Sequence, residues 1–386
     1  MDFAYSTDQE AWRDVVAAFL DDRAPLAKTR VRAERGDGPD TDLWRRMADL
    51  GLHGLHVPEH HGGQGFGVEE LAIVQEEMGA RLVGTPYVAS TVLAATLLAA
   101  LADAEPAAAD LLARVATGDL TGTVALWGPG TGWVDDGPGV RAAPAGAGTV
   151  TLTGTRTLVP YGADADLLLV TARHDDRPAL VAVTGAAAGL DRRTVKGLDL
   201  TTRYATVTFT GTHGVLLAEG EAARAALDRL ADHAYALLAA EMVGGARACL
   251  ENAVEYAGQR HQFGRPIGSF QAVKHLCADM LAELELARSA VLFAVWAVRT
   301  GDPRAASAAS TAKALAGDAY LFIADAALHI HGGMGFTWEH DSHLYLRRAR
   351  AASLLFGDAG HHRERFLRHA GFGPDPVPAS VTKGTP

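Results

Sequence analysis

Between Arg260 and Met280 the chain reads RHQFGRPIGSFQAVKHLCADM, which places a Gly/Pro turn between two long helical segments. The segment before it, Glu219 to Gln259, contains no proline and few glycines. Glycine and proline interrupt helices, so runs without them favour long helices. The helical runs that follow the turn are Gln271–Thr300, Arg304–His331 and Asp341–Leu355. We therefore predict a bundle of antiparallel helices over residues 218–370.

Two zones of different composition precede this bundle. Residues 1–120 are rich in alanine and leucine at helical spacing, which predicts an N-terminal α-helical domain. In residues 121–217, short β-branched runs such as GTVTLTGTRTLV alternate with Gly-rich turns, which predicts a central β-domain built as a sandwich or partial barrel. We expect residues 371–386 to form a disordered tail. In Glu10–Arg23, apolar residues form a stripe at helical spacing, which predicts a helix; they are Ala11, Val15, Ala18 and Phe19.

Composition excludes several classes of protein. The 386 residues are 48% hydrophobic and 21% charged, an ordinary globular balance. A net charge of −11 argues against nucleic acid as a main partner. With only Cys249 and Cys277, a disulfide framework is not expected, and a reducing cytoplasm fits. The acidic N-terminus does not resemble a signal peptide, and the apolar stretch Val88 to Ala102 is too short to cross a membrane. We therefore expect a cytoplasmic protein without a membrane partner.

The Arg260–Met280 stretch, taken with HGGMGFTWEHDSHLYLRRARA from His331 to Ala351, resembles the acyl-CoA dehydrogenase family of flavoproteins. The resemblance extends through LWRRMADLGLHGLHVPEHHGGQGFG and GTRTLVPYGADADLLLV, and it covers residues 8–368. It implies an α+β fold with an N-terminal helical domain, a central β-domain and a C-terminal four-helix bundle. It also implies an oxidoreductase of fatty acid metabolism that uses FAD as cofactor and an acyl-CoA thioester as substrate.

Arg260 and the residues after it are the first candidates for binding FAD. On its own, an arginine at a helix end is typical of a solvated cap. In the family, an arginine at this place pairs with the FAD pyrophosphate of a neighbouring subunit, and a guanidinium suits that role because it stays charged and offers paired donors. By resemblance, the dinucleotide is also bordered by Gln262, Phe263, Ile267 and Gln271.

The glycines of HGGMG form the second part of the expected FAD site. Such glycines can simply end a helix, but backbone without side chains also lets a phosphate or an adenine approach closely. The family uses this turn for the FAD of the partner subunit, which implies roles for Gly332, Gly333 and Gly335. His329 stands where the family usually has glutamine, and we keep it in the site as a hydrogen-bond donor.

In the β-domain, the family's flavin-contacting sequences are altered. Leu126 to Asp136 reads LWGPGTGWVDD, where the family often has Thr-Glu-Pro followed by Gly-Ser-Asp. Leu158-Val159-Pro160 stands in place of the family's Trp-Ile-Thr beside the isoalloxazine ring. Because Pro160 has no backbone N–H, a hydroxyl and an amide that would bond the flavin are missing. We expect the flavin to sit differently or to bind weakly.

Other polar clusters have simpler interpretations. Histidines at 329, 331, 340, 343, 361 and 362 lack a recognisable metal-ligand spacing, so we interpret them as loop and surface residues and predict no metal site. The basic run Arg347, Arg348 and Arg350 is interpreted as a solvated or interface face of a helix, with phosphate contact as the alternative.

The catalytic base of the family is missing from both of its usual positions. Family members remove a proton from the acyl α-carbon with a glutamate, while hydride leaves the β-carbon for flavin N5. At the C-terminal position this chain has Gly357, and on the long helix it has Ala234, 26 residues before Arg260. Glu241 is the remaining candidate base, two turns after Ala234 on the same face. Alternatively, Glu241 has a structural role and forms a hydrogen bond or salt bridge between helices.

Three functions remain open from the sequence. The first is an FAD-dependent acyl-CoA dehydrogenase that works as a homo-oligomer with an unusual base and passes electrons to an electron-transfer flavoprotein. The second is a non-catalytic, FAD-binding subunit of an α2β2 acyl-CoA dehydrogenase, in which a homologous subunit supplies the glutamate. The third is a flavoprotein oxidase or monooxygenase of the same fold.

Overall fold

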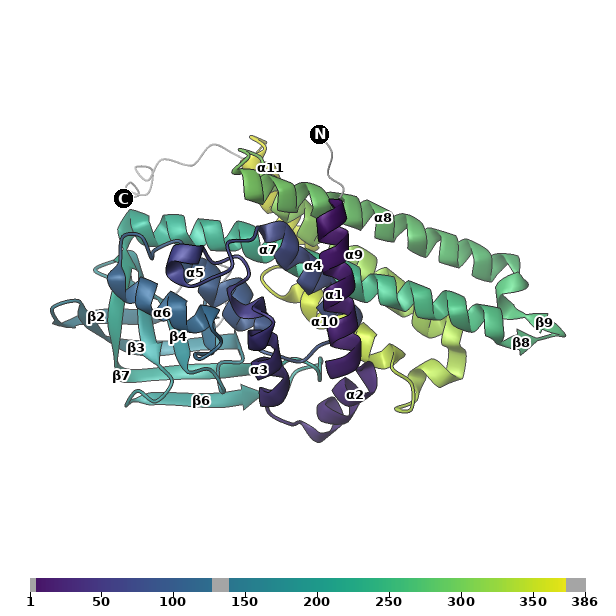
Figure 1. Cartoon of the computed structure of the whole chain (residues 1–386), viewed down its shortest axis with the longest axis horizontal. Helices are drawn as coiled ribbons and strands as arrows, with labels where there is room; N and C mark the ends of the chain where they lie inside the picture. The colour runs from purple at the N-terminus through teal and green to yellow at the C-terminus, as the bar shows by residue number, and fades with distance from the viewer. Residues whose placement is uncertain (1–4, 127–138, 373–386) are drawn as a thin grey trace, which may run out of the picture.

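The computed structural model describes residues 5–126 and 139–372. Helices come first, a β-sheet follows, and a helical bundle completes the described chain, as the resemblance implied (Figure 1). The 40-residue helix α7 (Gly220–Gln259) runs from the sheet to the far end of the bundle. It contacts α4, α5, η3, β5 and β7, and so joins the three parts of the chain.

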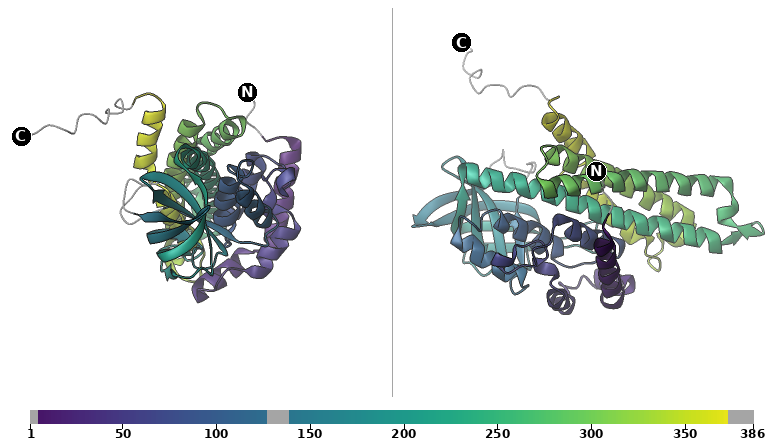
Figure 2. Two further views of the ribbon diagram at one scale, coloured as in Figure 1. Left: turned by 90° about the vertical axis from the view of Figure 1, so that its left-hand side faces the viewer. Right: turned by 45° about the horizontal axis from the view of Figure 1, so that its top comes forward.

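The helices of the N-terminal part lie beside the sheet and beneath the bundle, and α4 packs on both α1 and α7 (Figures 1 and 2). Helix α4 matters most for the site, because nearly the whole helix is buried and packs on α7. The helices are α1 (Thr7–Arg23), α2 (Leu26–Arg35), α3 (Thr41–Asp49), α4 (Val68–Ala80), η3 (Val88–Ala95), α5 (Thr96–Ala99) and α6 (Pro106–Ala116).

The buried face of α1 differs from the apolar stripe of the sequence. Val16 and Leu20 are fully buried, whereas Val15 is 48% exposed. Two adjacent valines leave the sequence period ambiguous by one position, which is a rotation of about 100° around a helix. The predicted helix is present, and its packing on α4 buries Val16 and not Val15 of the stripe.

The β-part is a seven-stranded sheet whose pairings close a ring. β3 pairs with β2 and β7, β7 with β5, β5 with β4, and β4 in parallel with β2. Valine, leucine and Phe209 side chains fill the interior of this predicted partial barrel. The strands are β1 (Gly122–Ala125), β2 (Val140–Gly146), β3 (Thr149–Pro160), β4 (Leu167–His174), β5 (Arg177–Thr184), β6 (Leu190–Val195) and β7 (Tyr204–Glu219).

The C-terminal bundle contains the four predicted helices and a further one. α7 lies beside α8 (Gln271–Thr300) and α9 (Ala305–His331), and a hairpin of β8 (His261–Gln262) and β9 (Arg265–Pro266) joins α7 to α8 at the far end of the bundle (Figures 1 and 2). After η5 (Gly332–Phe336), the helices α10 (Ser342–Leu354) and α11 (Ala359–His369) pack on α9.

Two glycines bring α4 and α7 into backbone contact. A Cβ atom on Gly244 would overlap the carbonyl oxygen of Glu76, and one on Gly79 would overlap that of Glu241. Only glycine allows so close an approach of two helices. The contact fixes the positions of the α4 and α7 side chains relative to one another, including Gln75 and Glu241.

The sequence predicts that Val88 to Ala102 does not cross a membrane and that residues 371–386 form a tail. In the described part of the chain, no helix combines the length and the apolar character that crossing a bilayer requires. Most of the apolar stretch Val88–Ala102 is buried within the N-terminal helices. Of the predicted tail, residues 373–386 lie outside the described residues.

Candidate active site

A cavity lies where the three parts of the chain meet. α4 contributes Gln75, α7 contributes Glu241, and α10 contributes Arg348. Pro160 and Tyr204, which pair at the ends of β3 and β7, line its sheet side. Most of the other lining side chains are apolar or aromatic, as is typical of ligand pockets.

Glu241 and Arg348 belong to a buried ion-pair cluster. Arg348 Nη1 donates a short hydrogen bond to Glu241 Oε1, and Arg348 Nε lies 2.8 Å from Asp199 Oδ2. Arg348 Nη2 also donates to Thr201 Oγ1 over 2.7 Å. The exposed fractions are 3% for Asp199, 6% for Arg348 and 8% for Glu241. Arg348 therefore lies inside the protein, not on a solvated helix face as its basic run suggested.

The cluster sets the charge state of its members. Burial raises the pKa of the Glu241 carboxyl, and the charge of Arg348 opposes that rise. Burial also disfavours the charged form of Arg348, but Asp199 and Glu241 raise its pKa well above the usual value. Arg348 thus stays cationic, and a proton taken up by Glu241 would weaken a buried ion pair.

Two polar side chains of the cavity have no hydrogen-bond partner among the described residues. Gln75 is fully buried with both amide atoms unpaired, and the hydroxyl of Thr85, which is 5% exposed, is unpaired as well. Each buried unpaired group costs about 1–3 kcal/mol, so such groups are rare unless a ligand or water completes them. The cavity leaves about 40 Å³ for them to share, enough for roughly three waters or one small polar group.

Gly357 occupies the first usual glutamate position in a conformation that excludes a side chain. Its φ is +108°, and a Cβ atom there would lie 2.5 Å from Cδ2 of His361. The Gly357 carbonyl accepts a hydrogen bond from Lys313 Nζ over 3.3 Å. The neighbouring Asp358 caps α11 by accepting from the His361 N–H over 2.8 Å.

The second usual position lies under α11. Ala234 and Tyr235 are fully buried. The ring of Tyr235 meets the ring of His362 edge-on at 4.5 Å, and the Arg365 guanidinium lies 5.0 Å from the centroid of the same ring. Side chains of α11 therefore cover Tyr235, the residue next to the second usual position of the family's base.

The two stretches predicted to bind FAD lie side by side at the far end of the bundle. Arg260 caps the C-terminus of α7 and is exposed. One turn earlier, Tyr256 stacks on His331 with a centroid distance of 4.6 Å, and His331 directly precedes Gly332. The stacked rings hold the end of α7 against the glycine turn within one chain.

Most of the predicted FAD residues face solvent. A Cβ atom on Gly332 or Gly333 would meet nothing within 4 Å, so their backbone is open to a ligand. Gly335 instead packs inside, because a Cβ there would lie 2.9 Å from the Leu328 carbonyl oxygen. Ile267 is half-buried. The exposed members are Arg260, Gln262, Phe263, Gln271, His329, Gly332 and Gly333.

On the sheet side, one residue of Leu158-Val159-Pro160, the segment in place of the family's Trp-Ile-Thr, lines the cavity. Pro160 lines the cavity, and its carbonyl accepts a hydrogen bond from Thr123 Oγ1 over 2.5 Å. Leu158 points outward and is 42% exposed. In the predicted flavin loop Leu126–Asp136, every residue after Leu126 lies outside the described residues.

The histidines singled out from the sequence form no metal-binding group in the described parts of the chain. His331 and His340 pack ring to ring at 4.4 Å, and His362 is fully buried beside Tyr235. Within residues 5–126 and 139–372, a group with metal-ligand geometry occurs elsewhere, at His60, His61 and Asp103. Sequence spacing did not reveal it, because Asp103 is more than 40 residues from the histidines.

Comparison with known proteins identifies the family. The models of the acyl-CoA dehydrogenase N-terminal and C-terminal domains match residues 6–119 and 216–371. The acyl-CoA dehydrogenase IpdE2 of Mycolicibacterium smegmatis is 33% identical over 353 residues, which cover 91% of this chain and 95% of that protein. The chain belongs to the acyl-CoA dehydrogenase family.

Solved structures of the family agree over the whole fold. The ChsE4-ChsE5 complex from Mycobacterium tuberculosis matches with a TM-score of 0.87 and 30% identity, covering 97% of this chain and 100% of that one. The Tcur3481-Tcur3483 steroid ACAD matches with a TM-score of 0.85 and 31% identity, covering 94% and 98%. The predicted family and fold class are therefore confirmed.

This acyl-CoA dehydrogenase is an FAD-dependent enzyme. At the far end of the bundle, the exposed guanidinium of Arg260 and the uncovered backbone of Gly332 and Gly333 are chemically suited to a dinucleotide. A dinucleotide needs both features, a cation for the pyrophosphate and backbone that permits close approach.

Proposed function

We propose that this acyl-CoA dehydrogenase works in an assembly of two homologous chains, in which the partner chain supplies the glutamate that removes the α-proton. The observation that carries the proposal is Gly357, whose φ of +108° and contact with His361 leave no room for a side chain at the first usual position. At the second position, Ala234 is buried and α11 covers its neighbour. Two solved relatives are themselves named as pairs, ChsE4-ChsE5 and Tcur3481-Tcur3483.

In this assembly, the far end of the bundle binds the cofactor. When bound, FAD supplies the hydride acceptor for the substrate β-carbon. Arg260 pairs with the pyrophosphate, and the backbone of Gly332 and Gly333 lies against the nucleotide. Exposed aromatic rings support a second chain at this end, because Phe263 is 91% and Phe336 is 67% exposed. We assign the reoxidation step to an electron-transfer flavoprotein, as the family resemblance implies.

A second candidate is a chain that carries its own base. Glu241 favours it, because Glu241 is the one carboxylate among the described residues that line the cavity, and burial raises its pKa. A raised pKa suits a general base at neutral pH. The ion pair with Arg348 weighs against it, because protonation would leave that cation with only Asp199 as its counter-charge.

The two candidates differ in what the chain does alone. We expect no bleaching of flavin absorbance when acyl-CoA is added to the purified chain supplied with FAD. Co-expression with a homologue that has glutamate at the position of Gly357 or Ala234 is expected to restore turnover. Bleaching by the lone chain would overturn the proposal. Loss of that bleaching in Glu241→Gln, but not in the exposed control Glu251→Gln, would establish the second candidate.

For the substrate, we propose an acyl group that carries a hydroxyl or carbonyl oxygen. Gln75 offers one donor and one acceptor site to the cavity, and Thr85 offers a hydroxyl, with no partner for either in the described chain. A carbonyl oxygen of the acyl group would accept a hydrogen bond from Gln75 Nε2 or from the Thr85 hydroxyl, and a hydroxyl group would also donate to Gln75 Oε1. One solved relative is named a steroid ACAD, and the small space beside Gln75 and Thr85 fits one oxygen-bearing group of an acyl chain.

The substitution Gln75→Leu tests the substrate class. Leucine keeps much of the volume and removes the amide, so kcat/KM of the active assembly is expected to fall about 5- to 150-fold for an oxygenated acyl-CoA, the equivalent of one lost buried hydrogen bond. For the analogue without that oxygen, kcat/KM should stay unchanged. Thr91→Val is the matched control, because this buried unpaired hydroxyl does not line the cavity. Equal losses for both substrates would contradict the proposal.

A further inference from the structure

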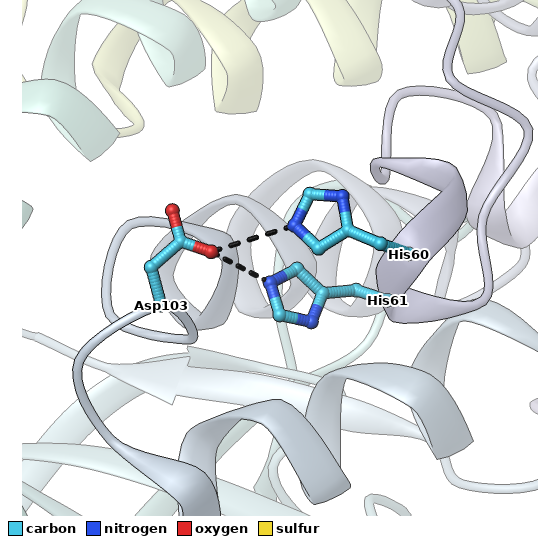
Figure 3. Close-up of side chains that lie close together, drawn as sticks. All are labelled: His60, His61 and Asp103. Carbon is cyan, nitrogen blue, oxygen red and sulfur yellow. Dashed lines mark hydrogen bonds and ion pairs between the residues drawn. The ribbon is translucent and has the colours of Figure 1, made fainter.

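His60, His61 and Asp103 gather their ligand atoms at one point of the N-terminal part of the chain (Figure 3). We infer that these three side chains form a Zn²⁺ site that connects the loop before α4 to the turn before α6. The inference goes beyond the dehydrogenase function, because the cluster contributes no residue to the cavity or to the predicted FAD residues.

The two separations between the histidines and Asp103 match the spacing of metal ligands. Nε2 of His61 lies 3.0 Å and Nε2 of His60 lies 3.4 Å from the same carboxylate oxygen, Oδ1 of Asp103 (Figure 3). All three ligand atoms lie within 4.8 Å of one another. A metal with bonds of about 2.0–2.1 Å spaces its ligands roughly 2.9–3.4 Å apart. A cation could therefore enter between these atoms with only small side-chain movements.

The backbone that presents the ligands is fixed on both sides. η2 (Glu59–His61) is a short 3-10 helix in which the His61 N–H donates to the Pro58 carbonyl over 2.9 Å. Asp103 lies in a turn that the Ala104 N–H closes by donating to the Leu101 carbonyl over 3.0 Å. Ligands on fixed backbone lose little freedom when a metal binds, which favours affinity.

The donor set selects the class of metal. Two imidazoles and one carboxylate favour zinc and its transition-metal neighbours over Mg²⁺ and Ca²⁺, which prefer oxygen ligands. The His61 side chain is only 13% exposed, whereas those of His60 and Asp103 are 67% and 84% exposed. The exposed side leaves room for water as the remaining ligands of Zn²⁺, so the metal would connect two loops without closing off the site.

Calorimetric titration of the full-length, chelator-treated chain with ZnCl₂ tests the inference. We expect one equivalent of Zn²⁺ bound, with affinity reduced by more than about tenfold in His61→Ala and in Asp103→Asn. His213→Ala is the matched control, because His213 is exposed and lies on β7, away from the cluster. Zinc should also raise the melting temperature of the wild-type chain and not that of the two variants.

A second readout identifies the ligands. Cu²⁺ added in equal amount should give an electron paramagnetic resonance spectrum with nitrogen coupling, and His60→Ala should reduce that coupling. The variants change surface side chains, so their metal-free melting temperatures serve as the folding check. Zinc binding that is absent, or that survives both His61→Ala and Asp103→Asn unchanged, would overturn the inference.

Discussion

Arg348 is the residue on which the cavity wall depends, because it pairs with Glu241 from α7 and with Asp199 from the loop before β7. Removing one partner of a buried ion pair leaves an uncompensated charge, which costs about 3–5 kcal/mol. We expect Arg348→Met to lower the free energy of unfolding by about that amount in urea titrations. The double variant Arg348→Met/Glu241→Gln should recover part of the loss. No recovery would show that Glu241 is not the charge left unpaired.

A second prediction concerns Gly357, which stands at the first usual position of the family's glutamate. Restoring the family's side chain with Gly357→Glu should not create a base, because a non-glycine residue at φ +108° is strained and its Cβ would collide with His361. We expect a loss of about 1–3 kcal/mol in stability, measured by urea unfolding, and no turnover by the lone chain. Gly258→Ala is the control, since its Cβ would meet nothing within 4 Å. A stable and active Gly357→Glu chain would contradict the account of the missing base.

At the scale of elements, Lys313 connects α9 to the end of α10. It is 1% exposed, and its Nζ donates to the carbonyls of Ala352 and Gly357 over 3.0 and 3.3 Å. The Ala352 carbonyl lies in the last turn of α10, where intrahelical partners are missing, and the Gly357 carbonyl lies in the turn after it, so Lys313 holds that turn to α9.

The buried amine makes stability depend on pH. Burial lowers the pKa of Lys313 from 10.5 to about 7, whereas in the unfolded chain it is about 10.4. Between these values the unfolded state binds a proton that the folded state lacks, so the free energy of unfolding rises with pH from about 7 to 10. Lys313→Met should remove this rise in urea titrations across that range, and the exposed control Lys274→Met should keep it. An unchanged slope in Lys313→Met would show that another group is responsible.

At the scale of the whole molecule, the two functional ends of the chain are separate. The cavity lies where sheet, N-terminal helices and bundle meet, and the predicted FAD residues lie at the far end of α7. In the assembly that we propose, one chain presents its predicted FAD residues to a neighbour. Phe263→Ser should weaken association between chains in sedimentation experiments, while Phe66→Ser, 55% exposed in the N-terminal part, should not. Equal effects would contradict an interface at the hairpin.

The amino-acid sequence alone determined the order of the parts, the long helices and the family. Breaker-free runs and β-branched runs are local patterns, and local patterns suffice to specify helices and strands. The motifs around Arg260 and Gly332 carried the resemblance for the same reason, since each lies in one short stretch. The absent glutamates at Gly357 and Ala234 were also visible by counting along the chain.

Only the tertiary structure decided which distant residues meet. Arg348 and Glu241 are 107 positions apart, and His61 and Asp103 are 42 apart, so no spacing rule links them. Burial turned Arg348 from an expected surface charge into the cation of an internal cluster, and packing on α4 chose Val16 over Val15 on α1. The physical reason is that side-chain pairing and burial depend on how helices and strands pack, whereas sequence periodicity describes each of them separately.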